Sequence, residues 1–257
     1  MKITLVQTPI VWGQKAENLR IIKKKIEKLA RQTDLVVLPE LFSTGFIIDR
    51  PELSETMSGA TVEMLMNMAE EGDFAITGSF LCAENGKTYN RAFFILPSGK
   101  IFTADKRHTF TLAHEEKYIE RGNKKLTVNY KGFNIRILVC YDIRFPVWAR
   151  NVDGEYDILI YVANFPDKRI EAWDALLPAR AIENQAFVCG VNRIGADGNG
   201  FTHAGHSQLI DYKGKRLLNF AEHEENEKTF EIEIEPLNTF REKFPFWKDA
   251  DDFRITN

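Results

Sequence analysis

Three side chains that together could cleave a carbon–nitrogen bond each close a strand-like run of this sequence. Cys140 ends the run RILVC, Glu40 ends DLVVLPE, and Lys106 ends KIFTADK. In open α/β sheets the carboxyl ends of the strands open onto the ligand crevice, where residues from distant parts of the chain meet. We therefore expect a thiol, an acid and a base to converge at one edge of a sheet.

Attack on an amide or nitrile carbon needs a nucleophile, a group that moves protons, and a positive charge near the developing oxyanion. The thiolate of Cys140 is the natural nucleophile, and a neighbouring Lys106 ammonium is expected to lower the pKa of that thiol. Glu40 is followed by the apolar stretch LFSTGFII, so we expect its carboxylate to lie in a dry pocket. These features suit a general base.

Each of the three residues also has an ordinary structural explanation. An isolated cysteine in a strand is most often a small buried hydrophobe. A glutamate after a proline is commonly a turn residue, and most lysines are solvated surface charges. Only the combination favours an active site.

Composition narrows the class of protein. The 257 residues contain no linker, which predicts a single domain over residues 1–257. A net charge of -3 gives no general attraction to nucleic acid. Cys82, Cys140 and Cys189 fit neither a disulfide framework nor a zinc-ligand spacing, and no apolar stretch has the length of a signal peptide or membrane span. We expect a cytoplasmic protein that binds neither membrane nor metal.

Hydrophobic periodicity predicts an α/β fold with mixed sheets. Strands are expected at residues 3–6, 35–38, 74–81, 91–96, 135–139, 158–162, 187–191, 207–212 and 230–234, and helices at 17–31, 61–71 and 171–185. Turns with glycine at 84–86 and 211–214 predict two hairpins. So many strands can form two packed sheets covered by helices, although periodicity alone does not require this arrangement.

Three segments resemble the catalytic segments of the nitrilase superfamily, in the order and over the length of that family: PELF at 39–42, DKRH at 105–108 and LVCYDIRFP at 138–146. The resemblance implies a four-layer α-β-β-α sandwich and hydrolysis of carbon–nitrogen bonds without a cofactor. It also implies that Cys140 is the nucleophile, Glu40 the general base, and Lys106 the cation that stabilises the tetrahedral intermediate, together with the backbone N–H of Tyr141.

The same resemblance implies a second glutamate that orients the lysine. The candidates are Glu115 and Glu116, and the spacing to Gly122 resembles the family better with Glu115. We expect Glu115 to have this role.

Further segments resemble the ω-amidase branch of the superfamily: ANFP at 163–166, AWD at 172–174, ARAIEN at 179–184, GVNR at 190–193 and FPFW at 244–247. This resemblance implies hydrolysis of the terminal amide of small 2-oxo acid amides such as 2-oxoglutaramate, which yields a dicarboxylate and ammonia. It also implies a homodimer or a larger homo-oligomer.

A substrate of this kind needs a donor-rich patch for its distal carboxylate. Arg144, four residues after Cys140, is a candidate bidentate partner, and an equally good alternative is that it pins the loop through Asp142 or backbone carbonyls. The aromatic side chains of Phe42, Tyr141 and Phe165 are then expected to wall the pocket. Aromatic residues at these places are also compatible with a hydrophobic core.

Three other functions remain open. A papain-like Cys-His enzyme would pair Cys140 with one of the histidines, which are His108, His114, His203, His206 and His223. A non-catalytic metabolite-binding protein would keep the pocket without the chemistry, but an unused activated thiol is an oxidation liability. Other amidases, carbamoylases and nitrilases of the superfamily share the same three residues, so those residues fix the reaction type better than the substrate.

Overall fold

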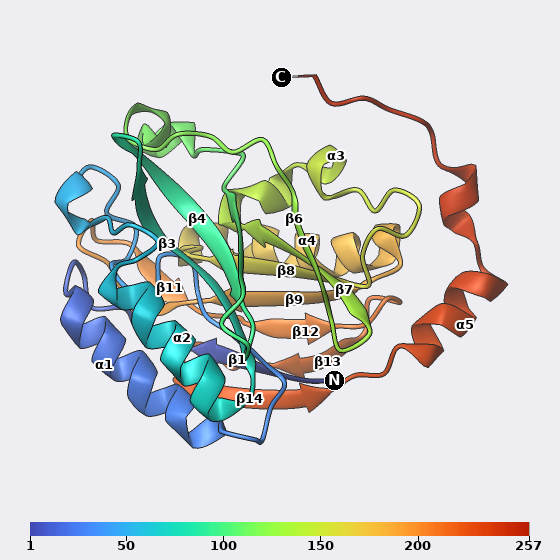
Figure 1. Cartoon of the computed structure of the whole chain (residues 1–257). Helices are drawn as coiled ribbons and strands as arrows, with labels where there is room; N and C mark the ends of the chain where they lie inside the picture. The colour runs from blue at the N-terminus through green and yellow to red at the C-terminus, as the bar shows by residue number, and fades with distance from the viewer. Residues whose placement is uncertain (257) are drawn as a thin grey trace.

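The computed structural model describes residues 1–256 and contains two six-stranded sheets that face each other (Figure 1). The first sheet has the strand order β14-β1-β2-β3-β4-β5, and the second has the order β13-β12-β9-β8-β7-β6. A small two-stranded sheet, β10 (Ile194–Ala196) with β11 (Thr202–Ala204), follows β9 in the chain. The predicted combination of mixed sheets in an α/β fold is confirmed.

The first sheet is parallel at its centre and antiparallel toward its edges. β1 pairs with β2 and β2 with β3 in parallel, whereas β14, β4 and β5 join in antiparallel fashion. Its strands are β1 (Lys2–Gln7), β2 (Leu35–Val37), β3 (Ala75–Glu84), β4 (Lys87–Ile95), β5 (Ile101–Asp105) and β14 (Asn226–Glu231). The hairpin between β3 and β4 is confirmed, with Asn85 and Gly86 both at positive φ, as a tight hairpin turn requires.

The second sheet has the same plan. Its central strands β7, β8 and β9 are parallel, and the outer strands are antiparallel to their neighbours. Its strands are β6 (Leu126–Tyr130), β7 (Phe133–Val139), β8 (Ile158–Ala163), β9 (Phe187–Asn192), β12 (Gln208–Ile210) and β13 (Arg216–Asn219). The predicted hairpin at 211–214 joins β12 to β13 and is also confirmed.

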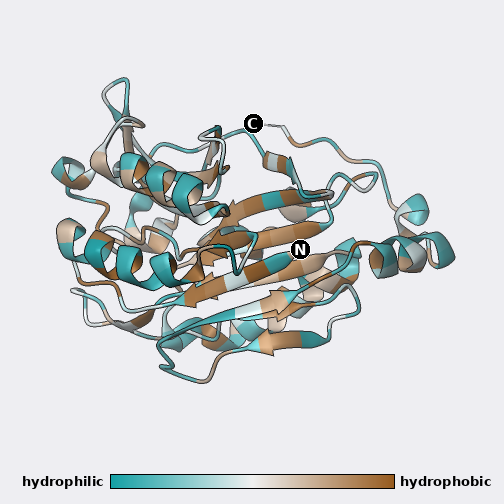
Figure 2. Cartoon of the chain, turned by 60° about the horizontal axis from the view of Figure 1, so that its bottom comes forward, coloured by the Kyte–Doolittle hydropathy of each residue, from teal (hydrophilic) through white to brown (hydrophobic). Residues whose placement is uncertain are grey.

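Helices cover the outer face of each sheet. Helices α1 (Lys15–Ile26) and α2 (Ala60–Gly72) pack on the first sheet, and α4 (Ile170–Asn184) packs on the second beside the short α3 (Pro146–Ala149). Figure 2 shows apolar strands inside and polar helical faces outside. These four layers are the α-β-β-α sandwich that the resemblance implies. The chain then continues through α5 (Glu235–Lys243) into a segment that extends away from the sheets (Figure 1).

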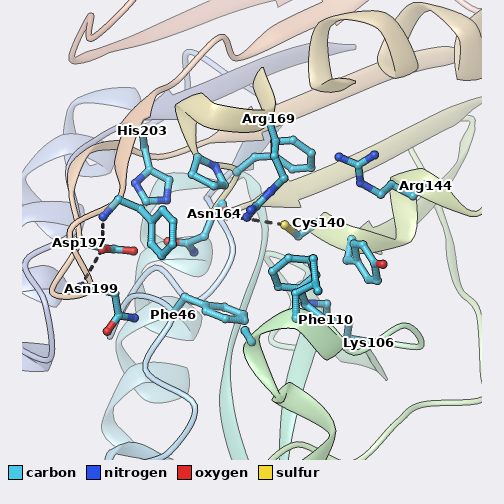
Figure 3. Close-up of a pocket in the computed structure, with 16 residues that line it drawn as sticks. Phe46, Lys106, Phe110, Cys140, Arg144, Asn164, Arg169, Asp197, Asn199 and His203 are labelled. Carbon is cyan, nitrogen blue, oxygen red and sulfur yellow. Dashed lines mark hydrogen bonds between the residues drawn. The ribbon is translucent and has the colours of Figure 1, made fainter. Parts of the chain in front are cut away.

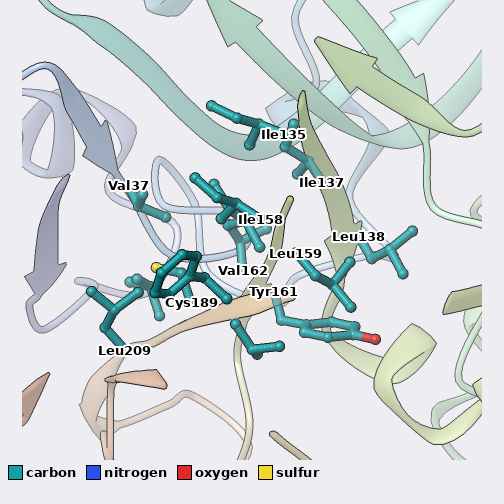
Figure 4. Packing of buried hydrophobic residues seen from close by; sticks show 14 of the residues in the cluster. Val37, Ile135, Ile137, Leu138, Ile158, Leu159, Tyr161, Val162, Cys189 and Leu209 are labelled. Atoms are coloured by element: carbon teal, nitrogen blue, oxygen red, sulfur yellow. The ribbon is translucent and has the colours of Figure 1, made fainter. Parts of the chain in front are cut away.

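Strand β2 shows how the apolar runs serve both packed faces. Leu35 and Val37 face the core between the sheets, and Val36 faces α1 and α2. Figure 4 shows part of the inner core, with Val37 from the first sheet and Ile158 and Val162 from the second. A parallel strand buried on both faces reads as a continuous apolar run, which is why β2 shows no alternation in the sequence.

Some elements differ from the sequence-based expectation. Strand β14 begins at Asn226, four residues before the predicted start, because its polar side chains pair along the antiparallel edge beside β1. Strand β6 and helix α5 were not predicted. Among residues 1–256, no helix is long and apolar enough to cross a membrane.

Candidate active site

The candidate active site lies where several strands of the two facing sheets end. Cys140 follows β7, Lys106 follows β5, and Asn164 follows β8, while Glu40 lies three residues beyond β2. The expected convergence is confirmed, since Lys106 hydrogen-bonds Glu40 and lines the same cavity as Cys140.

Cys140 occupies a strained turn at the end of its strand. Its φ of 43° lies in the left-handed region, which is unfavourable for a residue with a β-carbon. Asp142 holds this turn, since its carboxylate accepts hydrogen bonds from the backbone N–H groups of Val139 (3.1 Å) and His108 (3.0 Å). The turn presents the thiol to a cavity, with Sγ 3.9 Å from the carbonyl oxygen of Asn164.

Lys106 lies between two buried carboxylates. Its Nζ is 3.0 Å from Glu40 Oε1 and 3.0 and 3.1 Å from the two carboxylate oxygens of Glu115. Glu40 and Glu115 are fully buried, and only 2% of Lys106 is exposed. The backbone N–H of Phe110 donates to Glu115 at 2.6 Å and fixes that carboxylate. Glu115 is thus the glutamate that contacts the lysine, while Glu116 is exposed.

Burial and the two carboxylates set the protonation of this cluster. Burial disfavours the charge on Lys106, but the attraction of Glu115 and Glu40 outweighs that penalty and raises the pKa of the ammonium. Burial raises the pKa of Glu115. Burial, followed by the negative charge of Glu40, also raises the pKa of the Cys140 thiol well above its ordinary value, although Lys106 acts in the opposite direction. The predicted effect of Lys106 is thus present, but burial and Glu40 outweigh it, and the net shift of the thiol pKa is upward.

Two asparagines that the sequence analysis missed hold Glu40. Asn90 Nδ2 donates to Glu40 Oε1 at 2.8 Å, and the backbone N–H of Asn164 donates to Oε2 at 2.9 Å. The side-chain amide of Asn164 also donates to the backbone carbonyl of Glu40. These contacts hold the carboxylate that also binds Lys106, and its negative charge acts on the Cys140 thiol. Asn164 follows β8 directly, so the rule that singled out Cys140 would also have found it.

A cavity of about 370 Å³ opens above the thiol (Figure 3). This volume suits a small metabolite. Aromatic rings and polar groups from several loops line it: Phe46, Lys106, Phe110, Leu112, Ala113, Cys140, Tyr141, Arg144, Asn164, Phe165, Pro166, Arg169, Asp197, Asn199, Phe201 and His203.

The residues predicted to bind substrate divide into two groups. Tyr141, Arg144 and Phe165 line the cavity. Phe42 does not. It is 1% exposed and packs edge-on against Phe93 in the core under α1 and α2, so its prediction as a pocket wall is wrong.

The backbone explains why Phe42 points away from the cavity. Leu41 has a φ of 46°, which reverses the chain, and the N–H of Phe42 then donates to the carbonyl of Ser79 on β3. Phe46, four residues later, supplies the aromatic wall from this loop.

Within residues 1–256, Arg144 makes no hydrogen bond to Asp142 or to a backbone carbonyl of its loop. Asp142, its proposed partner in that alternative, hydrogen-bonds His108 and Val139 instead. The guanidinium of Arg144 lies 5.7 Å from the centroid of the Phe165 ring. A second cavity arginine, Arg169, had no signal in the sequence analysis.

The histidines do not form a pair with the thiol. Within residues 1–256 no histidine hydrogen-bonds Cys140. His108 Nδ1 contacts Asp142 at 2.7 Å, and His206 Nδ1 contacts Asp174 at 2.7 Å. His203 lines the cavity, but its Nδ1 faces the carbonyl of Gly195, and burial lowers the pKa of the imidazole to about 4. The part of the chain that the structure describes also contains no cluster of three or more metal-ligating side chains.

Comparisons with known proteins agree with this geometry. Residues 2–239 match the carbon-nitrogen hydrolase family. Omega-amidase YafV of Escherichia coli K12 is 40% identical over 99% of this chain and 98% of its own length. A 2-oxoglutaramate amidase of Bacillus subtilis is 33% identical over 96% of each chain.

Among solved structures, XC1258 of Xanthomonas campestris superimposes with a TM-score of 0.97 at 38% identity, over 100% of this chain and 99% of that one. It is a CN-hydrolase superfamily protein with an arsenic adduct in its active site. By the match over residues 2–239 and by these relatives, the chain belongs to the carbon-nitrogen hydrolase family of the nitrilase superfamily.

Proposed function

We propose that this protein is an ω-amidase, a hydrolase that converts the terminal amide of a small 2-oxo acid amide such as 2-oxoglutaramate to a carboxylate and ammonia. The observation that supports it most is the thiol of Cys140 at the floor of a small cavity, beside the buried Glu40–Lys106–Glu115 cluster. The relatives named as ω-amidase and 2-oxoglutaramate amidase support the choice of substrate.

The first step forms the tetrahedral intermediate. Cys140 Sγ attacks the amide carbon while Glu40 takes the thiol proton, so the neutral resting thiol becomes a nucleophile only as the bond forms. The electron pair of the carbonyl moves to oxygen. Lys106 and the backbone N–H of Tyr141 stabilise that oxyanion, a role that suits a cation kept charged by its two carboxylates.

The second step releases ammonia. Glu40 returns its proton to the amide nitrogen, the carbon–nitrogen bond breaks, and a thioester on Cys140 remains. Water then attacks the thioester carbon while Glu40 accepts a proton from it. The carbon–sulfur bond breaks, the thiol recovers the proton, and the carboxylic acid product leaves. The thiol proton leaves with ammonia and a proton from water replaces it, so Cys140 and Glu40 end in their starting protonation states and the cycle needs no cofactor.

Glu115 is a positioning residue in this scheme, because it contacts Lys106 and not the substrate. Tyr141 and Phe165 wall the cavity around the substrate, and Arg144 is proposed to face its distal carboxylate. We also propose a homodimer or a larger homo-oligomer, from the family resemblance, and a cytoplasmic location, from the cysteine spacing and composition of the sequence.

A substrate panel tests the assignment. Ammonia release is measured with 2-oxoglutaramate, 2-oxosuccinamate, glutamine, an N-carbamoyl amino acid and a simple nitrile. We expect the highest kcat/KM for the 2-oxo acid amides. Turnover of only the nitrile or only the carbamoyl compound would show that the protein is another member of the superfamily.

A further inference from the structure

Two arginines enter the cavity from the ends of neighbouring strands. Arg144 closes the 3-10 turn Cys140–Arg144 after β7, and Arg169 closes the turn Asp167–Arg169 that follows β8. β7 and β8 are paired in parallel, so both turns lie at the same edge of the second sheet. Figure 3 shows both side chains on the cavity wall near Cys140.

Neither guanidinium has a hydrogen-bond or ion-pair partner among residues 1–256. Both side chains are half-buried, and two arginines that are buried elsewhere in the protein are paired. Arg91 binds Asp105 and Glu84, and Arg180 binds the carbonyl of Ile143 and the carboxylate of Glu183. The five donors of an arginine normally find acceptors when they leave water. The two cavity arginines therefore present unpaired N–H donors to the cavity.

Each guanidinium rests on an aromatic ring instead. Arg144 lies 5.7 Å from the Phe165 centroid, and Arg169 lies 4.8 Å from the Phe110 centroid. Such a cation–π contact attracts the charge to the ring without using an N–H donor, so these donors stay free for an acceptor. The rings thus attract both groups without neutralising them.

The charges around the cavity leave these cations uncompensated. Lys106 is neutralised by its own two carboxylates. Asp197, the other carboxylate on the wall, accepts the backbone N–H groups of Asn199 and Phe201 and lies on the opposite side of Cys140 from Arg144 (Figure 3). Burial lowers the pKa of Arg169, and the positive charge of Arg144 acts in the same direction. A bound anion would relieve both penalties.

We propose that Arg169 is a specificity-determining residue that, with Arg144, binds the distal carboxylate of the substrate. The proposal rests on the proposed amidase function and adds to it the residue that selects acidic amides. The reacting amide sits at Cys140, and the carboxylate end lies between the two guanidinium groups. Uncharged amides of the same length lack this anchor.

The first test compares two five-carbon amides, 2-oxoglutaramate and pentanamide, in the wild type, Arg169→Met and Arg20→Met. Arg20 is an exposed arginine on α1 paired with Glu17, and it serves as the control. Loss of charge-assisted hydrogen bonds to a carboxylate should reduce the ratio of kcat/KM for 2-oxoglutaramate over pentanamide by about 100-fold in Arg169→Met. Arg20→Met should keep the wild-type ratio. An unchanged ratio in Arg169→Met would overturn the proposal.

The second test measures the binding of glutarate, so it does not depend on hydrolysis. We expect glutarate to bind the wild type more tightly than pentanamide does, and Arg169→Met to bind glutarate at least about 10-fold more weakly. Equal glutarate affinity in the wild type and the variant would contradict the carboxylate site. If the wild type binds glutarate through Arg169 but hydrolyses neither amide, the proposed amidase function fails while the carboxylate site stands.

Discussion

Glu40 Oε1 and Lys106 Nζ lie 3.0 Å apart in the interior of the protein, although 66 residues separate them in the sequence. With Glu115 on its other side, the lysine is a buried cation between two acids. Burial of such charges is costly unless each one is paired. The cluster therefore contributes to both stability and catalysis, and replacing each member should affect these two properties differently.

Replacement of the lysine should affect activity and stability together. In Lys106→Met two carboxylates lose their shared cation, which should destabilise the protein by about 3–5 kcal/mol. Loss of the oxyanion partner should lower kcat/KM for 2-oxoglutaramate by about 1000-fold. Urea unfolding and ammonia release measure the two effects, and Lys117→Met, at an exposed lysine nearby, is the control. Full activity in Lys106→Met is what a Cys-His enzyme would show.

The two adjacent glutamates offer a matched pair. Glu115→Gln keeps the shape of a side chain that contacts Lys106 but removes its charge, and Glu116→Gln changes an exposed one. We expect kcat to fall by about 100-fold in Glu115→Gln with KM little changed, because the lysine is misplaced for the transition state and not for substrate binding. Glu116→Gln should match the wild type. A loss confined to KM, or an equal loss in both variants, would argue against this positioning role.

The resting state of the nucleophile can be titrated. Burial and Glu40 raise the pKa of the Cys140 thiol, so the thiolate should be absent at neutral pH and form only as the pH rises well above the ordinary cysteine value. The difference in thiolate ultraviolet absorbance between the wild type and Cys140→Ala, followed from pH 6 upward, measures this directly. A thiolate signal already complete at pH 7 would indicate an ion pair with Lys106 instead.

His203 should make the folded protein sensitive to acid. Its pKa falls from 6.5 to about 4 on burial, so its contribution to stability is complete above pH 6.5 and is lost as the pH falls toward 4. The linked free energy is about 3 kcal/mol. In His203→Asn a side-chain amide can still donate to Gly195. We expect the wild type to lose about 3 kcal/mol relative to this variant between pH 7.5 and pH 4, by urea unfolding. Parallel pH curves would contradict the shift.

The core of the site was predictable because its residues end strands. Cys140, Glu40 and Lys106 each follow an apolar run, and the carboxyl ends of parallel strands meet at one edge. Asn164 also follows a strand directly. It was not predicted because an asparagine carries neither a charge nor a nucleophile. The assignment of Glu115 rested on family resemblance, since its approach to Lys106 depends on the fold of the loop around Phe110.

Side-chain direction was the feature that the sequence could not supply. Phe42 turns into the core because Leu41 adopts positive φ. A leucine gives no indication of this conformation in the sequence. Arg169 faces the cavity because of the turn after β8, and periodicity says nothing about such turns. The direction of the thiol pKa likewise depended on burial by both sheets and on the position of Glu40.

The role of Cys140 is tested most directly by ammonia release from 2-oxoglutaramate in the wild type and in Cys140→Ala. The side chain is small and already 8% exposed, so the substitution should leave the protein folded, and thermal unfolding of both proteins checks this. We expect the wild type to release ammonia and the folded variant to release none. Release at the wild-type rate by Cys140→Ala would contradict the assignment of this thiol as the nucleophile.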